Sequence, residues 1–314
     1  MSPTLFTTED GDIILHAGSD SDPKHDFRVH KLILSLASPV FKDMFAFPQP
    51  PDQTFNGSHQ LPVIDVQEPP EVLDDILRFV YPGVEPPKIN DLPKLTVMLS
   101  MADKYNITSI YPPLREKLRM FLLPTFSNPF RVYIIACRFG FSEVAREAAG
   151  ALNPRDLEYL NDRGREDLQY VSSTSLFQLV QFTLARERQG LSTIRAALDQ
   201  SWLEDSTDCS HHGKDAQDYY FHLQKAVEDA FITNPRVGSK DLFAVLDLVP
   251  DPPPGCDPLP KPADWYYEGG DEEAFSCPLQ AMTIRRRLSD IADDLHHINI
   301  TTLDKYFGKY NGGT

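Results

Sequence analysis

Hydrophobic and polar residues change their spacing near position 31, and this change separates strand-like from helix-like segments. Residues 11–17, "GDIILHA", and residues 27–31, "FRVHK", alternate as strands do, and the polar residues between them predict a hairpin. From 32 to 45 the apolar positions recur at helical intervals: Leu32, Ile33, Leu36, Val40, Phe41, Met44 and Phe45. Serine caps helices well and proline suits the first helical position, so Ser38-Pro39 predicts two short helices with a joint at 37–38.

The next segments add one strand and several helices. A proline-rich loop precedes residues 61–66, "LPVIDV", which we predict to be a third strand. Residues 69–83, "PPEVLDDILRFVYPG", carry an apolar stripe closed by Pro82-Gly83, and residues 91–123 predict two more helices parted by Asn106. Strands followed by helices are typical of an α+β fold. We therefore predict an α+β domain over residues 1–124, with a small sheet packed against a helical cluster.

Residues 125–314 show almost no strand-like alternation. Asn128-Pro129 and Asn153-Pro154 each place a capping side chain before a proline, which is typical of helix starts. Further helical patterns follow, interrupted by residues 250–270, which carry too many prolines for a helix. We therefore predict an all-α C-terminal domain over residues 125–314 with a proline-rich excursion at 250–270.

Composition and charge exclude several classes of protein. Hydrophobic residues make up 41% and charged residues 24% of the chain, which is typical of a folded globular protein. The formal net charge is −16 and no basic stripe is present, so we expect no nucleic-acid partner. The N-terminal region has no apolar run long enough for a signal peptide or a transmembrane helix. We expect a cytoplasmic or nuclear location, no membrane partner, and cysteines that remain thiols.

Five motifs, taken in order, resemble the BTB/POZ family over about residues 11–122. They are Asp-Ile before the first strand at 12–13, Phe-x-x-His-Lys at 27–31, Ser-x-x-Phe-x-x-Met-Phe at 38–45, Tyr-x-Gly at 81–83 and Ala-Asp-Lys-Tyr at 102–105. Each motif alone is weak, but their order and spacing make the set specific. Residues 44–50, "MFAFPQP", are similar to fungal-type members of the family.

This resemblance implies roles for particular residues. Asp12, His30 and Lys31 match polar positions at the corner where a strand turns into a helix, and we expect them to be structural. The core positions of the family match Phe27, Leu34, Phe41, Met44 and Phe45. The helices after residue 128 resemble the BACK-like helical extension that often follows this domain in adaptor proteins.

The resemblance also implies protein partners and no catalysis. We expect a non-enzymatic interaction module, scaffold or adaptor without a cofactor, and one form of it is a substrate adaptor of a cullin-type ubiquitin ligase. Such adaptors carry an apolar-x-Glu motif in a loop that here, at residues 47–60, contains no glutamate, so we expect cullin binding to be weak. Because only about ten residues precede Asp12, we expect a monomer or a weak homodimer. The alternative is a homo-oligomerising transcriptional or regulatory cofactor without direct DNA binding.

Two local clusters are candidates for a metal site and a phosphorylation site. Cys209, His211 and His212 lie close enough in the sequence to share a metal ion, which makes a metal-dependent enzyme a less favoured alternative. Their spacing is irregular and the common catalytic motifs are absent, so we favour a polar loop without a metal. Ser289 follows a basic run, as kinase substrates do, but the aspartates within 290–294 would repel a phosphate there. We therefore interpret Ser289 as part of an ordinary helix face and keep it as a candidate phosphorylation site.

Overall fold

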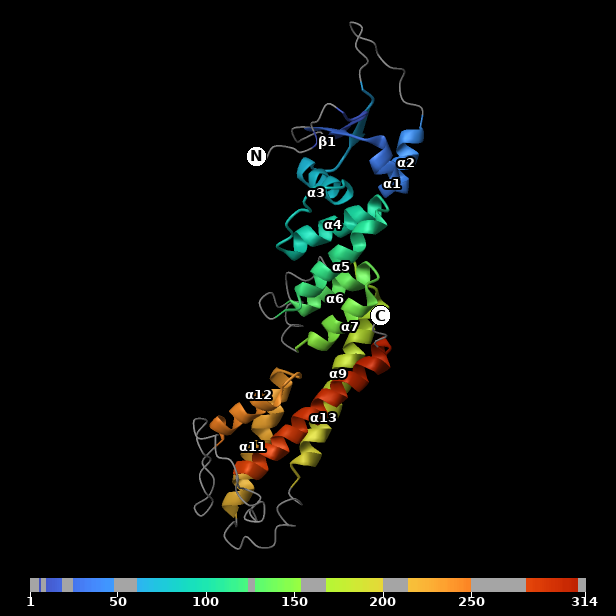
Figure 1. Cartoon of the computed structure of the whole chain (residues 1–314). Helices are drawn as coiled ribbons and strands as arrows, with labels where there is room; N and C mark the ends of the chain where they lie inside the picture. The colour runs from blue at the N-terminus through green and yellow to red at the C-terminus, as the bar shows by residue number, and fades with distance from the viewer. Residues whose placement is uncertain are drawn as a thin grey trace, which may run out of the picture. The chain divides into compact units, whose positions relative to one another are not determined.

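The computed structural model of the chain (Figure 1) describes residues 6, 10–18, 25–47, 61–123, 128–153, 168–199, 214–249 and 281–309. The chain divides into two compact units, Met1–Ser127 and Asn128–Thr314, and each is described by itself. The first unit contains a sheet with helices, whereas the described residues of the second contain helices alone. This arrangement confirms the predicted fold class. The excursion at 250–270 lies outside the described residues, and the predicted domains, residues 1–124 and 125–314, stay a prediction.

Three strands form the sheet in the described part of the first unit, in the order β2-β1-β3. Strand β1 (Ile13–Ala17) pairs antiparallel with β2 (His25–Val29) and parallel with β3 (Val63–Val66). The alternation seen in the sequence places every second side chain on the buried face, because successive residues of a strand point to opposite sides. The fully buried side chains of β1 and β2 are Ile13, Leu15, Ala17, Phe27 and Val29.

Two short helices follow the hairpin and meet at Ser38. Helix α1 (Lys31–Ala37) ends one residue before it, and α2 (Pro39–Ala46) begins one residue after it, so the predicted joint is confirmed. The Ser38 hydroxyl accepts a hydrogen bond from the backbone N–H of Phe41 at 3.0 Å, as an N-cap does. It also donates to the backbone carbonyl of Tyr105 at 2.5 Å, which ties this joint to a helix 67 residues further along the chain.

The remaining helices of the first unit are α3 (Pro70–Val80), α4 (Leu92–Lys104) and α5 (Tyr111–Met120). The carboxylate of Asp91 caps α4 by accepting from the backbone N–H of Lys94 at 2.8 Å. After α4, Asn106 adopts a positive φ of 50°, a conformation that asparagine tolerates better than most residues, and the helix stops there. A short 3-10 turn, Thr108–Ile110, leads into α5.

The second unit starts with a hairpin of helices, α6 (Pro129–Arg138) and α7 (Ser142–Ala151), followed by the long α9 (Ser173–Ala197). The predicted cap at Asn128 is confirmed, since its side chain accepts from the backbone N–H of Arg131 at 3.1 Å. The helix predicted to start at Pro154 lies outside the described residues.

The C-terminal part of this unit contains α11 (Lys214–Thr233), α12 (Ser239–Ala244), the 3-10 turn η3 (Val245–Leu248) and α13 (Ala281–Phe307). Helix α13 runs alongside α9 (Figure 1), and both pack with α11 and α12 around one apolar core. At Gly190 a Cβ atom would lie 2.1 Å from the ring of Phe231, so only glycine allows α9 and α11 to approach this closely. None of the described helices is both long and apolar enough to cross a membrane.

Candidate functional site

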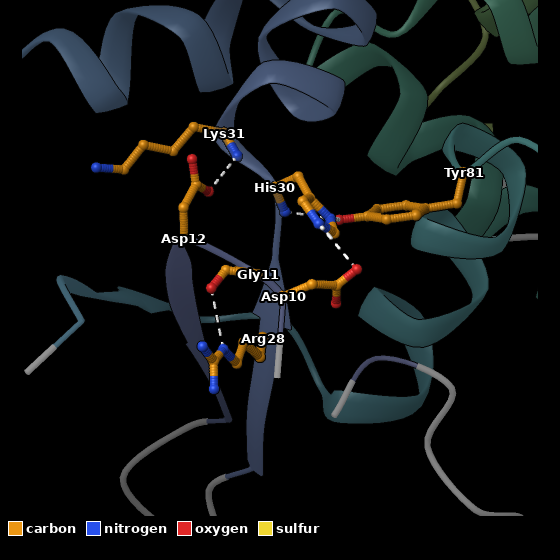
Figure 2. A network of polar contacts seen from close by, with 7 residues as sticks. All are labelled: Asp10, Gly11, Asp12, Arg28, His30, Lys31 and Tyr81. Atoms are coloured by element: carbon orange, nitrogen blue, oxygen red, sulfur yellow. Dashed lines mark hydrogen bonds and ion pairs between the residues drawn. The ribbon is translucent and has the colours of Figure 1, made fainter. Parts of the chain in front are cut away.

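The corner where β2 turns into α1 holds a network of polar contacts (Figure 2). His30, the residue before α1, forms no side-chain cap. The carboxylate of Asp12 takes over this role by accepting from the backbone N–H of Lys31 at 2.8 Å, while the side chain of Lys31 extends away from it (Figure 2). A helix N-terminus favours a carboxylate because its first N–H groups lack partners within the helix. Asp12, the residue before β1, therefore stabilises the start of α1.

His30 links this corner to the end of α3. Its backbone N–H donates to the Tyr81 hydroxyl at 2.7 Å, its Nδ1 lies 3.2 Å from the same oxygen, and its Nε2 lies 3.5 Å from the carboxylate of Asp10. Burial raises the pKa of Tyr81 above its usual value, the hydrogen bond from the His30 backbone partly offsets this, and the charges of Asp12 and Asp10 raise the pKa further. The Phe6 ring packs edge-on against the Tyr81 ring with 4.9 Å between centroids. The side chains of His30 and Tyr81 thus join the sheet to α3.

Arg28 holds the segment before β1 against the outer edge of β2. Its backbone N–H donates to the carbonyl of Phe6 at 2.8 Å, and its Nε donates to the carbonyl of Gly11 at 3.0 Å. A Cβ atom on Gly11 would lie 2.7 Å from the Arg28 Cγ and 2.9 Å from the backbone of Val29, so the close approach requires glycine. Sequence reasoning missed Phe6, Arg28 and Tyr81 in this network, because their partners lie on other elements.

A second polar cluster surrounds Glu68, which precedes α3. This carboxylate is buried and accepts from the Tyr105 hydroxyl at 2.6 Å and from the ammonium group of Lys104. Burial, and then the hydrogen bond and charge of Glu68, raise the pKa of Tyr105 far above its usual value. The Tyr105 ring stacks on the ring of Phe41, with 4.5 Å between centroids. The Lys-Tyr pair of the Ala-Asp-Lys-Tyr motif therefore holds α4 against the start of α3.

The expected core positions differ in how deeply they are buried. Phe27, Leu34 and Phe41 are fully buried. Met44 and Phe45 are only partly buried, although the Phe45 ring stacks on the Phe41 ring at 5.9 Å. All of these polar and apolar contacts join residues of the first unit to one another, so they stabilise its fold. The surface of the unit stays available for other contacts.

The exposed face of α1 is a candidate interaction surface. Leu32 is 70% exposed and Leu36 is 80% exposed. Residues four apart lie on the same face of a helix, so these two side chains form one apolar patch, which we call the α1 leucine pair. A hydrophobic pattern in the sequence could not separate them from the buried Leu34, because all three lie on the same short helix.

The structure tests neither the candidate metal cluster nor the candidate phosphorylation site. Cys209, His211 and His212 lie outside the described residues. In the part of the chain that the structure describes, no three His, Cys, Asp or Glu side chains are arranged to hold a metal ion. Ser289 lies partly exposed on α13, and two residues before it the Nε of Arg287 donates to the carbonyl of Ala197 at 2.9 Å. Phosphorylation of Ser289 stays a prediction.

Comparison with known proteins places the first unit in a family. The BTB/POZ domain family matches residues 5–121, a range that includes the sheet, the helices α1 to α5 and both polar clusters. Residues 5–121 are a BTB/POZ domain. Two mouse proteins are similar to part of this chain: TD and POZ domain-containing protein 1 is 31% identical over 86 residues, and TD and POZ domain-containing protein 5 is 30% identical over 86 residues. Each alignment covers 27% of this chain, but only 22% and 23% of these relatives.

The BTB/POZ domain is generally a protein–protein interaction module and typically has no catalytic role. The matched range ends at residue 121, before α6, so the match does not extend to the helical unit. The corner network and the Glu68 cluster therefore belong to the framework of the BTB/POZ domain, and the α1 leucine pair lies on its surface.

Proposed function

We propose that this chain is a non-enzymatic scaffold or adaptor whose BTB/POZ domain binds proteins through α1 and whose helical unit recruits a second protein. The observation that carries the proposal is the α1 leucine pair, two large apolar side chains that are 70% and 80% exposed. Fully burying a leucine stabilises a complex by about 1.5–3 kcal/mol, so water-exposed leucines favour association.

The partner that best fits this patch is the same face of a second copy. An isologous pair would bring two leucines from each copy together around a twofold axis. Stable interfaces bury about 800 Å² on each partner, which is far more than two leucines supply. The size of the patch therefore supports a weak homodimer that exchanges with the monomer.

Sedimentation equilibrium of the full chain over a range of concentrations tests this proposal. We expect a monomer–dimer equilibrium with a dissociation constant in the micromolar range, and the double variant Leu32→Glu, Leu36→Glu should be monomeric throughout. The matched control is Leu184→Glu on α9, since Leu184 is also an exposed helical leucine, at 51%. Self-association that survives the α1 double variant but not the control would refute the assignment of the interface.

A more specific version of the adaptor role is that of a substrate adaptor for a cullin-type ubiquitin ligase. The layout of a BTB/POZ domain followed by helices supports it, while the loop at 47–60 contains no glutamate for the apolar-x-Glu contact. An apolar anchor at such an interface is worth about 2 kcal/mol, or roughly thirtyfold in affinity. We therefore expect weak binding in calorimetry with a cullin N-terminal domain, and nanomolar affinity would contradict this expectation.

The alternative role is a homo-oligomerising regulatory cofactor without direct DNA binding. The α1 leucine pair supports self-association in this role too, and the net charge of −16 argues against direct contact with phosphates. Affinity purification of the intact chain followed by mass spectrometry separates the two roles. Recovery of cullin and ligase subunits favours the adaptor, and recovery of transcriptional regulators favours the cofactor.

A further inference from the structure

A small apolar pocket opens between α3 and α5 of the BTB/POZ domain. Phe79 near the end of α3, the loop residues 86–90, and Pro113, Leu114 and Lys117 of α5 line a volume of about 240 Å³. We call it the α3–α5 pocket. None of the α1 residues lines it, so it is separate from the α1 leucine pair.

Two positive charges face this pocket without a carboxylate partner. Lys88 and Lys117 line it, and neither forms an ion pair with any other residue that the structure describes. Two other lysines of the same domain are paired: the ammonium group of Lys94 lies 2.8 Å from the Asp75 carboxylate, and that of Lys104 contacts Glu68.

The carboxylates next to these lysines in the sequence are already engaged elsewhere. Glu116, beside Lys117, accepts from Arg119 at 2.8 Å and 3.0 Å. Asp91, three residues after Lys88, caps α4. Glu85 lies on the same loop but does not line the pocket. In a chain with a net charge of −16, this leaves a local positive charge around an apolar hollow.

We propose that the α3–α5 pocket receives one large apolar side chain of an acidic peptide segment in a partner protein, whose flanking carboxylates pair with Lys88 and Lys117. The volume supports a side chain better than a cofactor, because small-molecule sites usually measure about 300–1,000 Å³. Apart from the two lysines, Asn90 supplies the only polar side chain in the lining, too few groups to orient a cofactor.

The two lysines match the charge of a carboxylate-bearing peptide. A lysine acts as a compact point charge on a flexible stem, so it can pair with a flanking carboxylate without the planar bidentate geometry that arginine requires. Charges at the edge of an interface mainly set orientation and association rate, and the apolar contact supplies the anchor. This proposal rests on the proposed role in protein interaction and names a partner chemistry for a surface other than α1.

Fluorescence anisotropy with the full chain tests the pocket. The probes are three fluorescein-labelled peptides, Glu-Asp-X-Asp-Glu, in which X is Leu, Phe or Trp. We expect saturable binding of at least one probe, weakened when sodium chloride is raised from about 50 mM to about 500 mM, because salt screens exposed charges. A peptide with Ser at X should lose binding.

Three variants locate the binding site. Lys88→Ala with Lys117→Ala should weaken binding about fivefold to tenfold, as expected for two exposed charge pairs. Asn90→Trp, at an exposed lining position, should fill the hollow and abolish binding with the lysines intact. The control Lys42→Ala removes an exposed lysine of α2 and should leave affinity unchanged.

Two results would overturn the inference: no saturable binding by any of the three probes, or equal affinity in the wild-type chain and the double lysine variant. Each is distinguishable from failure of the proposed function. The α1 variant Leu32→Glu, Leu36→Glu should still bind the probe, and the double lysine variant should still self-associate.

Discussion

The BTB/POZ domain and the helical unit each bury one charged residue among the residues described, and they satisfy it in different ways. Glu68 is 4% exposed and bonds to two side chains, the Tyr105 hydroxyl and the Lys104 ammonium group. Arg186 is 2% exposed, and no carboxylate pairs with it in the described part of the chain. Its guanidinium donates to the backbone carbonyls of Leu152 at 2.7 Å and Gly150 at 3.4 Å, at the end of α7.

Both solutions obey one rule, that a buried charge needs hydrogen-bond partners. A helix C-terminus carries unpaired carbonyls and a negative partial charge, so a buried arginine suits the end of α7. Burial is still unfavourable for the cation, and it lowers the pKa of Arg186 to about 10. The BTB/POZ domain thus uses side chains of a recognisable motif, whereas the helical unit uses backbone groups that any sequence supplies.

The largest expected effect is in the aromatic core of the BTB/POZ domain. Phe41→Ala should lower the free energy of unfolding of this domain by about 3–5 kcal/mol, because the ring is fully buried and stacked on Tyr105. Phe45→Ala should have a smaller effect, since its side chain is only partly buried. Native-state hydrogen exchange of amides in β1 and α4 measures both losses. Equal losses would contradict the difference in burial.

In the helical unit, Arg186→Ala should lower the free energy of unfolding by about 2–3 kcal/mol, since it leaves the carbonyls at the end of α7 without a charged donor. Arg186→Lys should lie between the wild type and the alanine variant. Amide exchange in α7 and α9 gives the measurement, with the BTB/POZ amides as an internal control. Unchanged protection of α7 would show that these hydrogen bonds add nothing to stability.

A smaller effect is expected at the corner where β2 turns into α1. Asp12→Ala removes the cap of α1 and should lower the free energy of unfolding by about 1 kcal/mol. Asp12→Asn keeps an acceptor and should retain most of this stability. Lys31→Met should be neutral, because Asp12 contacts the Lys31 backbone and not its ammonium group. Urea denaturation followed by circular dichroism compares the three variants, and a large effect of Lys31→Met would overturn this account of the cap.

The smallest expected effect is the response to metal chelation. If the helical unit folds on its apolar core, as the BTB/POZ domain does, the purified chain should contain no stoichiometric metal. Treatment with a chelator should then leave its melting temperature unchanged. Elemental analysis by mass spectrometry tests this directly. A content of about one zinc ion per chain, lost in the variant Cys209→Ala, His211→Ala, would contradict this expectation. It would show that the helical unit depends on a metal and the BTB/POZ domain does not.

Sequence patterns predicted the elements of the fold better than they predicted which side chains are buried. The strand alternation at 11–17, the helix joint at Ser38 and the cap at Asn128 appear in the structure where they were expected. Among the apolar residues of the first two helices, however, Phe41 is fully buried while Leu36 is 80% exposed. Periodicity identifies an apolar face, but the neighbours that cover it come from elsewhere in the chain.

The candidate sites show the same limit. The motif residues Lys104 and Tyr105 were visible as a pattern, yet their partner Glu68 lies 36 and 37 residues away and belongs to no motif. The α3–α5 pocket is lined by residues between positions 79 and 117, and no spacing in the sequence indicates that they line the same pocket.

By itself, the sequence determined the local features of this protein: its helix starts, its turns and the order of its strands and helices. These depend on capping side chains, on proline and on apolar spacing within a few residues, so they can be read before the chain folds. Tertiary structure alone decided that Asp12 caps a helix starting 19 residues later and that Leu32 and Leu36 stay exposed. Burial and hydrogen bonding between distant residues depend on which surfaces meet, and only the packed chain decides this.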